Sequence, residues 1–240
     1  MGAVTDSQQP VDFEQEHPQA SATAGKWRYR VLFSKLGPLR YVSNLDLARL
    51  WERISRRAKL PLAYSQGFNP RPKIQLAAGL PLGYLSTFEI VDLWLVNPID
   101  SMSDMLTELN RMSPEGITVI RIAEAEVSQP ALQSITDHAG YQVRIQEICP
   151  EDLPERIASF NNLTSCIRSR REKQYDLRLL VDNLRQQQSE PEHIEMTLAL
   201  SQKRGTARVD EVMDALELGD LNYEVTRTSI ELEAPYTLGI

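Results

Sequence analysis

The order in which the apolar residues change their spacing is the feature that most constrains the fold. In the first half the spacing is that of a strand, then of a helix, a pair of short strands, a buried strand, a second helix and a last strand. This order predicts the split βαβ arrangement of a ferredoxin-like unit with an extra strand. The predicted elements are strands at 27–33, 39–42, 62–65, 73–78, 88–96 and 117–122, and helices at 44–58 and 102–112.

The second half of the chain repeats this alternation. Residues 175–184 fit both a strand and a helix, and we interpret them as a short helix. We therefore predict an α+β fold of two tandem ferredoxin-like (split βαβ) halves with antiparallel sheets, at residues 26–126 and 127–240. The other elements predicted in the second half are strands at 141–145, 163–168, 194–200 and 223–232, and helices at 150–160 and 209–216.

Residues 1–25 differ from the rest of the chain. They contain four acidic residues, no Lys or Arg, and no periodic apolar pattern, which predicts a disordered acidic tail. The sequence has no apolar run of 18 residues, and residues 1–6 lack the basic and apolar regions of a signal peptide. We therefore expect a cytoplasmic protein that makes no contact with a membrane.

Charge is distributed unevenly along the chain. The whole sequence has a net charge of −7, yet residues 26–79 contain twelve Lys and Arg against two acidic residues. A basic surface concentrates polyanions, and an acidic body limits nonspecific binding. The uneven distribution predicts a phosphate-bearing partner for residues 26–79.

The predicted helix at 44–58 has one apolar stripe and, opposite it, a stripe of four arginines, Arg49, Arg53, Arg56 and Arg57. Only Glu52 lies among them. Arginine presents a planar set of donors that suits phosphate oxygens and can stack on bases. The alternative interpretation is an ordinary solvated helix surface.

The loop at 64–73 contains two aromatic residues, amide donors and two cations, and one glycine and two prolines restrict its backbone. A rigid loop of this composition is suited to single-stranded RNA, whose unpaired bases offer faces for stacking beside phosphates. The alternative is a hairpin connection with Tyr64 and Phe68 in the core. A smaller basic cluster at 168–173 extends the predicted track or forms an exposed strand end. The predicted RNA-binding residues are Arg40, Arg49, Arg53, Arg56, Arg57, Lys59, Tyr64, Phe68, Asn69, Arg71 and Lys73.

Motifs for most enzymatic chemistry are absent from the sequence. It contains no phosphate-binding P-loop, no dinucleotide fingerprint and no nucleophile elbow. The three histidines do not have metal-ligand spacing, and Cys149 and Cys166 are too few for a zinc or iron–sulfur site. We predict both cysteines to be buried, and expect no catalytic residue, no metal and no cofactor in this chain.

Residues 39–83 also carry a family resemblance, most specific in three segments: 40–46 (RYVSNLD), 60–73 (LPLAYSQGFNPRPK) and 80–83 (LPLG). The chain resembles the bacterial radical SAM-linked protein family, a domain of unknown function, over residues 27–232. Members are fused to, or encoded with, a B12-binding radical SAM protein. The resemblance implies such an enzyme as partner, and because this chain lacks the cluster and cobalamin motifs, another chain would supply the radical chemistry.

Three functions remain open from the sequence. The leading hypothesis is an RNA-binding accessory module that presents tRNA or rRNA to a separate radical SAM enzyme. The second is an RNA-processing or RNA-modifying enzyme, with Tyr41, Asp46, Tyr64 and Lys73 as candidate groups. The third is a protein adaptor that docks the radical SAM partner.

Overall fold

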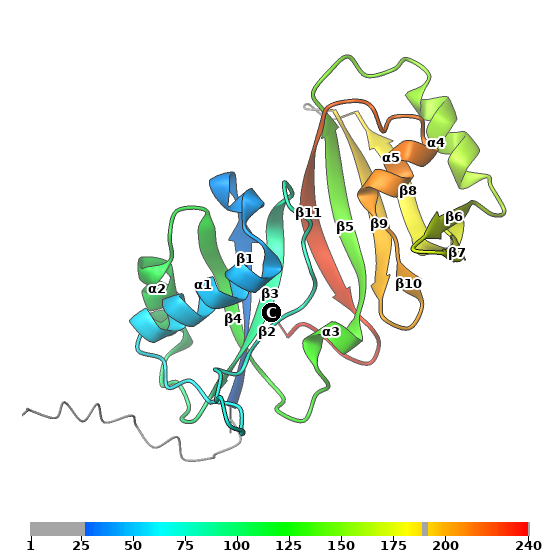
Figure 1. Cartoon of the computed structure of the whole chain (residues 1–240). Helices are drawn as coiled ribbons and strands as arrows, with labels where there is room; N and C mark the ends of the chain where they lie inside the picture. The colour runs from blue at the N-terminus through cyan, green and yellow to red at the C-terminus, as the bar shows by residue number, and fades with distance from the viewer. Residues whose placement is uncertain (1–26, 189–191, 240) are drawn as a thin grey trace, which may run out of the picture.

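The computed structural model describes residues 27–188 and 192–239, so the predicted acidic tail at 1–25 lies outside the described residues. The fold is mixed α+β, with one large, mostly antiparallel sheet and a few short helices (Figure 1). The helices are η1 (Gly37–Tyr41) and η2 (Arg178–Leu180), both 3-10, and α1 (Asn44–Arg57), α2 (Met102–Met112), α3 (Leu132–Ile135), α4 (Leu153–Asn161) and α5 (Val209–Ala215). The strands are β1 (Trp27–Lys35), β2 (Ile74–Leu76), β3 (Leu85–Leu95), β4 (Ile117–Ala125), β5 (Thr136–Ile145), β6 (Ile167–Arg170), β7 (Lys173–Asp176), β8 (Val181–Gln187), β9 (His193–Ser201), β10 (Gly205–Thr206) and β11 (Tyr223–Leu232). None of the described helices is long and apolar enough to span a bilayer.

The large sheet runs in the order β10-β9-β5-β11-β3-β1-β4, with β2 beside β3 and β8 beside β9. Strands β4, β1, β3 and β2 are antiparallel neighbours in that order, and so are β8, β9, β5 and β11. The two sets join where β11 pairs with β3 in parallel, through Thr226 with Leu85 and Arg227 with Ser86. One sheet therefore passes through both halves of the chain.

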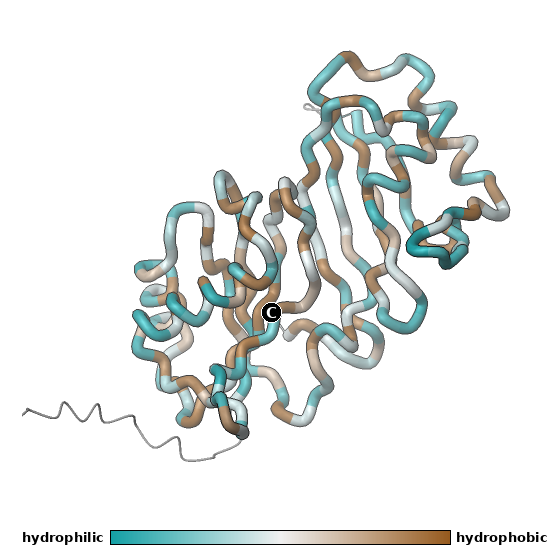
Figure 2. Tube along the Cα trace, viewed as in Figure 1, coloured by the Kyte–Doolittle hydropathy of each residue, from teal (hydrophilic) through white to brown (hydrophobic). Residues whose placement is uncertain are grey.

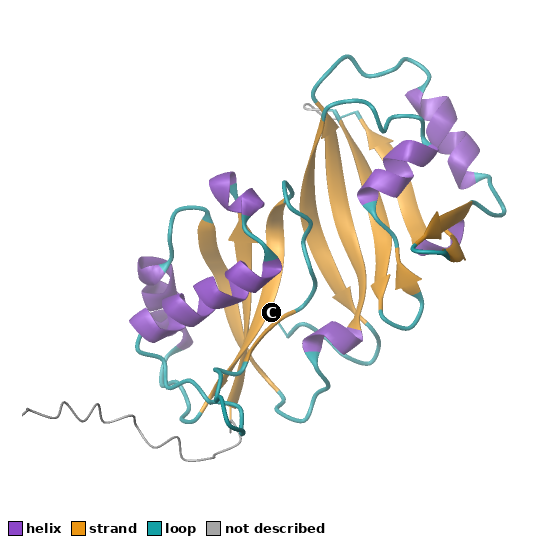
Figure 3. Ribbon diagram, viewed as in Figure 1, coloured by secondary structure: helices purple, strands orange, loops and turns teal. Residues whose placement is uncertain are grey.

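Helices cover one face of each set of strands, α1 and α2 on the first and α4 and α5 on the second (Figure 3). Alternate residues of β1, namely Tyr29, Val31 and Phe33, enter the first core, where the Phe33 ring lies 4.8 Å from that of Trp51 on α1. Apolar residues concentrate along the strands, whereas the β6–β7 hairpin is among the most hydrophilic segments (Figure 2). Burial of these alternating side chains is the main stabilising contribution.

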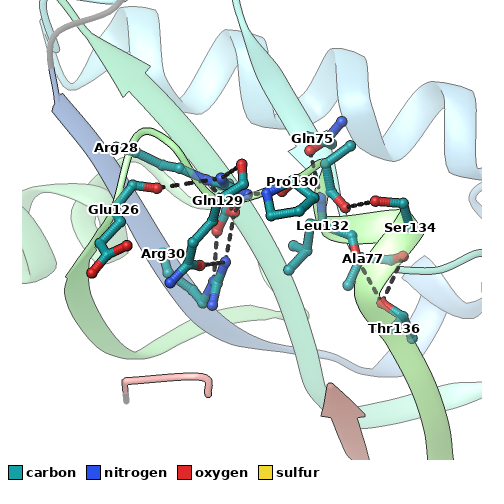
Figure 4. Close-up of polar contacts among 12 residues, drawn as sticks. Arg28, Arg30, Gln75, Ala77, Glu126, Gln129, Pro130, Leu132, Ser134 and Thr136 are labelled. Atoms are coloured by element: carbon teal, nitrogen blue, oxygen red, sulfur yellow. Dashed lines mark hydrogen bonds and ion pairs between the residues drawn. The ribbon is translucent and has the colours of Figure 1, made fainter. Parts of the chain in front are cut away.

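The opposite face of β1 is also covered, although it carries charged side chains. Arg28 and Arg30 are fully buried and share the carboxylate of Asp92 on β3, at 2.8 and 2.9 Å. Arg28 also donates to the carbonyl oxygens of Gln129, at 2.8 Å, and Pro130, at 3.2 Å, in the segment between β4 and α3 (Figure 4). These contacts hold that segment against the back of the sheet.

A second buried ionic cluster lies where the two halves meet. Arg227 of β11 is fully buried and binds Glu89 of β3 through two nitrogens, at 2.5 and 2.8 Å. The buried ammonium of Lys35 donates to the carbonyl oxygen of Val42 at 3.0 Å, and burial lowers the Lys35 pKa. Among the basic residues at 27–79, all of which the structure describes, three are therefore internal: Arg28, Arg30 and Lys35.

Several sequence predictions need correction. Residues 39–42, predicted as a strand, belong mostly to η1, which Pro38 starts in the position that proline favours. Residues 175–184, predicted as a short helix, comprise the end of β7, η2 and the start of β8. A register shift between Val181 and Asn183 interrupts the alternation of β8, so the spacing of its apolar residues resembles that of a helix. Residues 62–65 form isolated bridges at Leu62 and Tyr64 instead of a strand, and the two cysteines are half-buried.

Candidate nucleic-acid interface

Helix α1 places four arginines on its solvent side. Its N-terminus is capped by Ser43, whose side chain accepts a hydrogen bond from the Asp46 backbone N–H at 3.2 Å. Leu47, Trp51 and Ile54 are buried against the sheet, which fixes the rotation of the helix. The exposed side therefore carries Arg49, Arg53, Arg56 and Arg57, as predicted from their spacing.

Two of these arginines are paired with carboxylates of the same helix. Arg49 lies 3.1 Å from Asp46, and Arg56 lies 2.8 Å from Glu52. Exposed pairs of this kind contribute about 0–1 kcal/mol and are readily exchanged for another anion. Arg53 and Arg57 form no ion pair with any residue that the structure describes. The face therefore has a net positive charge.

The loop after α1 is closed by hydrogen bonds across its base. The backbone N–H of Ser65 donates to the carbonyl of Arg71 at 2.8 Å, and the Arg71 N–H donates to the Ser65 hydroxyl at 3.0 Å. Phe68 lies between these two residues in the sequence and is fully exposed. The alternative interpretation, with Phe68 in the core, does not hold, and the ring is accessible to a ligand.

Tyr64 joins the loop to the helix. Its ring packs partly against the first core, and the guanidinium carbon of Arg56 lies 5.7 Å from the ring centroid. This distance is within the range of a cation–π contact. This contact joins the arginine face to the loop that follows the C-terminal end of α1. The loop leaves that end of the helix in Figure 1.

A groove of about 380 Å³ lies beside the loop, between Arg71, Lys73 and Trp94. Trp94 is half-exposed, and Arg28 stacks on its ring at 4.7 Å. Trp94 is not among the predicted site residues, because the apolar run at 88–96 indicates a buried strand. Alternation was the available signal: Leu93 and Leu95 enter the core, so Trp94 faces the other side.

The remaining predicted residues are distributed around this surface. Lys59 and Asn69 are exposed, beyond α1 and at the loop tip respectively. Arg40 differs because its guanidinium binds Glu224 of β11 at 2.6 Å, and this hydrogen bond raises the Arg40 pKa. Arg40 therefore links η1 to the second half, and its charge is already paired.

The smaller basic cluster does not extend the track. Arg170 binds Glu211 of α5 and stacks on Tyr175 at 4.9 Å, so its charge is used within the second half. The β6–β7 hairpin lies at the other end of the molecule from α1 (Figure 1).

The four groups considered for catalysis are not brought together. Asp46 lies in the first turn of α1, whereas Tyr64 contacts Arg56 in the last turn, ten residues later. A helix rises about 1.5 Å per residue, so about 15 Å of helix separates Asp46 from Arg56. Tyr41 ends η1, before the start of α1, whereas Lys73 follows Pro72, which pairs with Tyr64. The four groups therefore do not form one cluster. In the part of the chain that the structure describes, no group of three His, Cys, Asp or Glu residues could hold a metal ion.

Comparison with known proteins identifies a family. The family model described as "Uncharacterized protein conserved in bacteria (DUF2344)" matches residues 28–209. No curated protein matches the chain. A chain of the crystal structure of a Cbf5-Nop10-Gar1 complex is similar at 9% identity and a TM-score of 0.45; the match covers 84% of this chain and 48% of that one. This chain thus matches about half the length of that chain.

Proposed function

The chain belongs to the DUF2344 family, an uncharacterised family conserved in bacteria, and from the geometry of its surface we propose that it binds single-stranded RNA. The contact between Arg56 and Tyr64 carries the proposal, because it makes one surface of two features. One feature is the arginine face of α1, and the other is the loop that carries Phe68.

The two features have complementary roles in this proposal. The arginines of α1 neutralise successive phosphates, which gives binding that depends on salt. Phe68 and Trp94 offer ring faces on which unpaired bases stack, with Arg71 and Lys73 beside them for the backbone. A duplex hides its base faces, so a surface of this kind favours single strands.

The strand order also suggests how the two halves are built. We interpret the two sets of four antiparallel strands as ferredoxin-like halves, because each has the order fourth, first, third, second. We also propose that the chain acts in the cytoplasm and presents RNA to a B12-binding radical SAM protein, as the family resemblance implies.

Fluorescence anisotropy with a single-stranded RNA of about 12 nucleotides tests the proposal. The double variant Arg53→Glu with Arg56→Glu should weaken RNA binding at least tenfold. Its free energy of unfolding should stay close to that of the unchanged chain, because both side chains are exposed. The matched control, Arg121→Glu with Arg171→Glu, makes the same charge change at exposed arginines away from α1. Equal losses in both double variants, or none in either, would exclude α1 as the binding face.

A protein adaptor is the second candidate, and one observation favours it. Tyr41, Leu45 and Leu82 are 71%, 59% and 61% exposed around η1 and the start of α1. Exposed apolar side chains gathered on a surface are typical of protein contacts. The adaptor would be favoured if the chain bound the partner enzyme tightly, RNA did not compete with that binding, and the chain had no affinity for RNA.

A further inference from the structure

A pocket lies between the two halves of the molecule and is distinct from the arginine face. Its volume is about 320 Å³. One side is formed by Asn44 at the start of α1 and by residues 79–84, and the other by Tyr141 of β5 and residues 206–209 before and at the start of α5. Neither half alone encloses it. A volume near the lower end of the range for small-molecule sites, about 300–1,000 Å³, suits one small ligand.

The walls of the pocket are suited to a flat heterocycle. Most of the lining is apolar, with the phenol rings of half-buried Tyr84 and of Tyr141, which is 5% exposed. Burial raises the pKa of both phenols, so both are neutral near pH 7 and donate hydrogen bonds. Aromatic side chains with a small number of polar groups are typical of sites that bind a planar ligand.

Asn44 is held at the edge of this pocket by a close backbone approach. Its side-chain oxygen accepts a hydrogen bond from the Leu80 N–H at 3.2 Å. Its side-chain nitrogen lies only 2.6 Å from where a Cβ on Gly79 would be, so any larger residue at 79 would displace the amide. The amide therefore has a fixed position from which it can contact the edge of a base.

The buried charges behind the pocket favour an anion. Arg227 donates to the carbonyl oxygen of Gly79, a lining residue, at 3.2 Å. With Lys35 protonated, the cluster of Lys35, Arg227 and Glu89 has a net charge of +1. At the mouth, the exposed charges of Asp210 and Arg208 have opposite signs, and Asp210 acts more strongly on the Tyr84 phenol. Buried charges are screened less than exposed ones, so the buried cluster contributes a positive potential on the Gly79 side of the pocket.

We propose that this pocket binds one nucleotide, with the base between the tyrosines and the phosphate near Arg208. This inference rests on the proposed function, because in single-stranded RNA the occupant would be an unpaired nucleotide turned out of the strand. Asn44 and Arg53 are nine residues apart on α1, so about 14 Å of helix separates the pocket from the middle of the arginine face. At about 100° per residue the two side chains face opposite sides of α1, so an RNA strand on the arginine face turns around the N-terminal end of the helix to reach the pocket.

Isothermal titration calorimetry with AMP and UMP tests the pocket on the full chain, with adenosine, uridine and inorganic phosphate as separate titrants. We expect saturable binding of a monophosphate, weaker binding of its nucleoside, and no binding of phosphate alone. Thr206→Trp fills the mouth from an exposed lining position and should weaken binding at least tenfold, whereas Thr206→Val should not. Arg208→Gln should weaken the monophosphate severalfold and leave the nucleoside unchanged.

The outcomes separate this inference from the proposed function. The double variant Arg53→Glu with Arg56→Glu should lose RNA affinity but keep mononucleotide affinity, because these residues lie outside the pocket. Absence of saturable mononucleotide binding, or binding that a folded Thr206→Trp variant retains, would overturn the pocket while leaving RNA binding on α1 intact. Mononucleotide binding without any RNA affinity would instead overturn the proposed function alone.

Discussion

Replacing Phe68 with alanine separates a binding role from a structural one. Its side chain is 102% exposed and therefore buries no apolar area on folding. Phe68→Ala should change the free energy of unfolding by less than about 0.5 kcal/mol, as is usual for surface substitutions. If the ring stacks on a base, the same change should cost about 1–3 kcal/mol of RNA binding, or about 5- to 150-fold in affinity.

Tyr64 provides the contrast within the same loop. Its ring packs against the first core and against Arg56, so Tyr64→Ala should reduce both stability and RNA affinity. Phe68→Trp should restore the affinity lost in Phe68→Ala, because an indole ring also stacks. Leu179→Ala, at a 67% exposed position in η2, is the matched control for loss of exposed apolar surface.

The assay combines RNA anisotropy with urea unfolding on each variant. Unchanged RNA affinity in a normally folded Phe68→Ala variant would exclude stacking by this ring. A loss of stability above about 1 kcal/mol would instead contradict its exposed position.

Other outcomes follow from the charged contacts. Asp92→Asn leaves two buried guanidiniums without a carboxylate and should cost about 3–5 kcal/mol in urea unfolding. Arg53→Gln with Arg57→Gln should reduce the slope of log RNA affinity against log salt by about 1.4, at about 0.7 per phosphate. Glu52→Gln frees Arg56 and should strengthen RNA binding at low salt, measured by anisotropy. Hydrogen bonds to the Asp176 carboxylate, chiefly from the Cys166 backbone N–H, lower the pKa of Asp176. The stability that this carboxylate contributes is therefore present above pH 3.8 and is lost as the pH falls below that value. In urea unfolding, Asp176→Asn should lack this part of the pH dependence.

Helix α1 was predictable because its information is local. The capping serine, the apolar stripe and the arginine stripe all lie within sixteen consecutive positions, 43–58, and the structure places each as its spacing indicates. The position of Tyr64 relative to Phe68 was not predictable, because both are aromatic residues in one loop. Contacts across the loop, among them the hydrogen bonds between Ser65 and Arg71 and the contact of Tyr64 with Arg56, place Tyr64 against the core and Phe68 outside it.

The buried arginines of β1 show what local pattern cannot reveal. Arg28 and Arg30 alternate with core residues, and charged residues in that position usually face water. The segment that covers them lies about 100 positions later, and its carbonyls bind the guanidinium of Arg28. The basic surface is accordingly smaller than the sequence count suggests.

The place of β11 in the sheet has a consequence for how the protein is made. Strand β11 is the last along the chain, yet it lies at the centre of the sheet, between β5 and β3. A chain is synthesised in order, so β5 has an open edge until residue 232 has emerged. The start of β3, at Leu85 and Ser86, also waits for β11, whereas β2 already pairs with the end of β3. Unpaired edges bind other strands readily. Synthesis that stalls before β11 would therefore leave a chain prone to aggregation, although most of its residues had already been made.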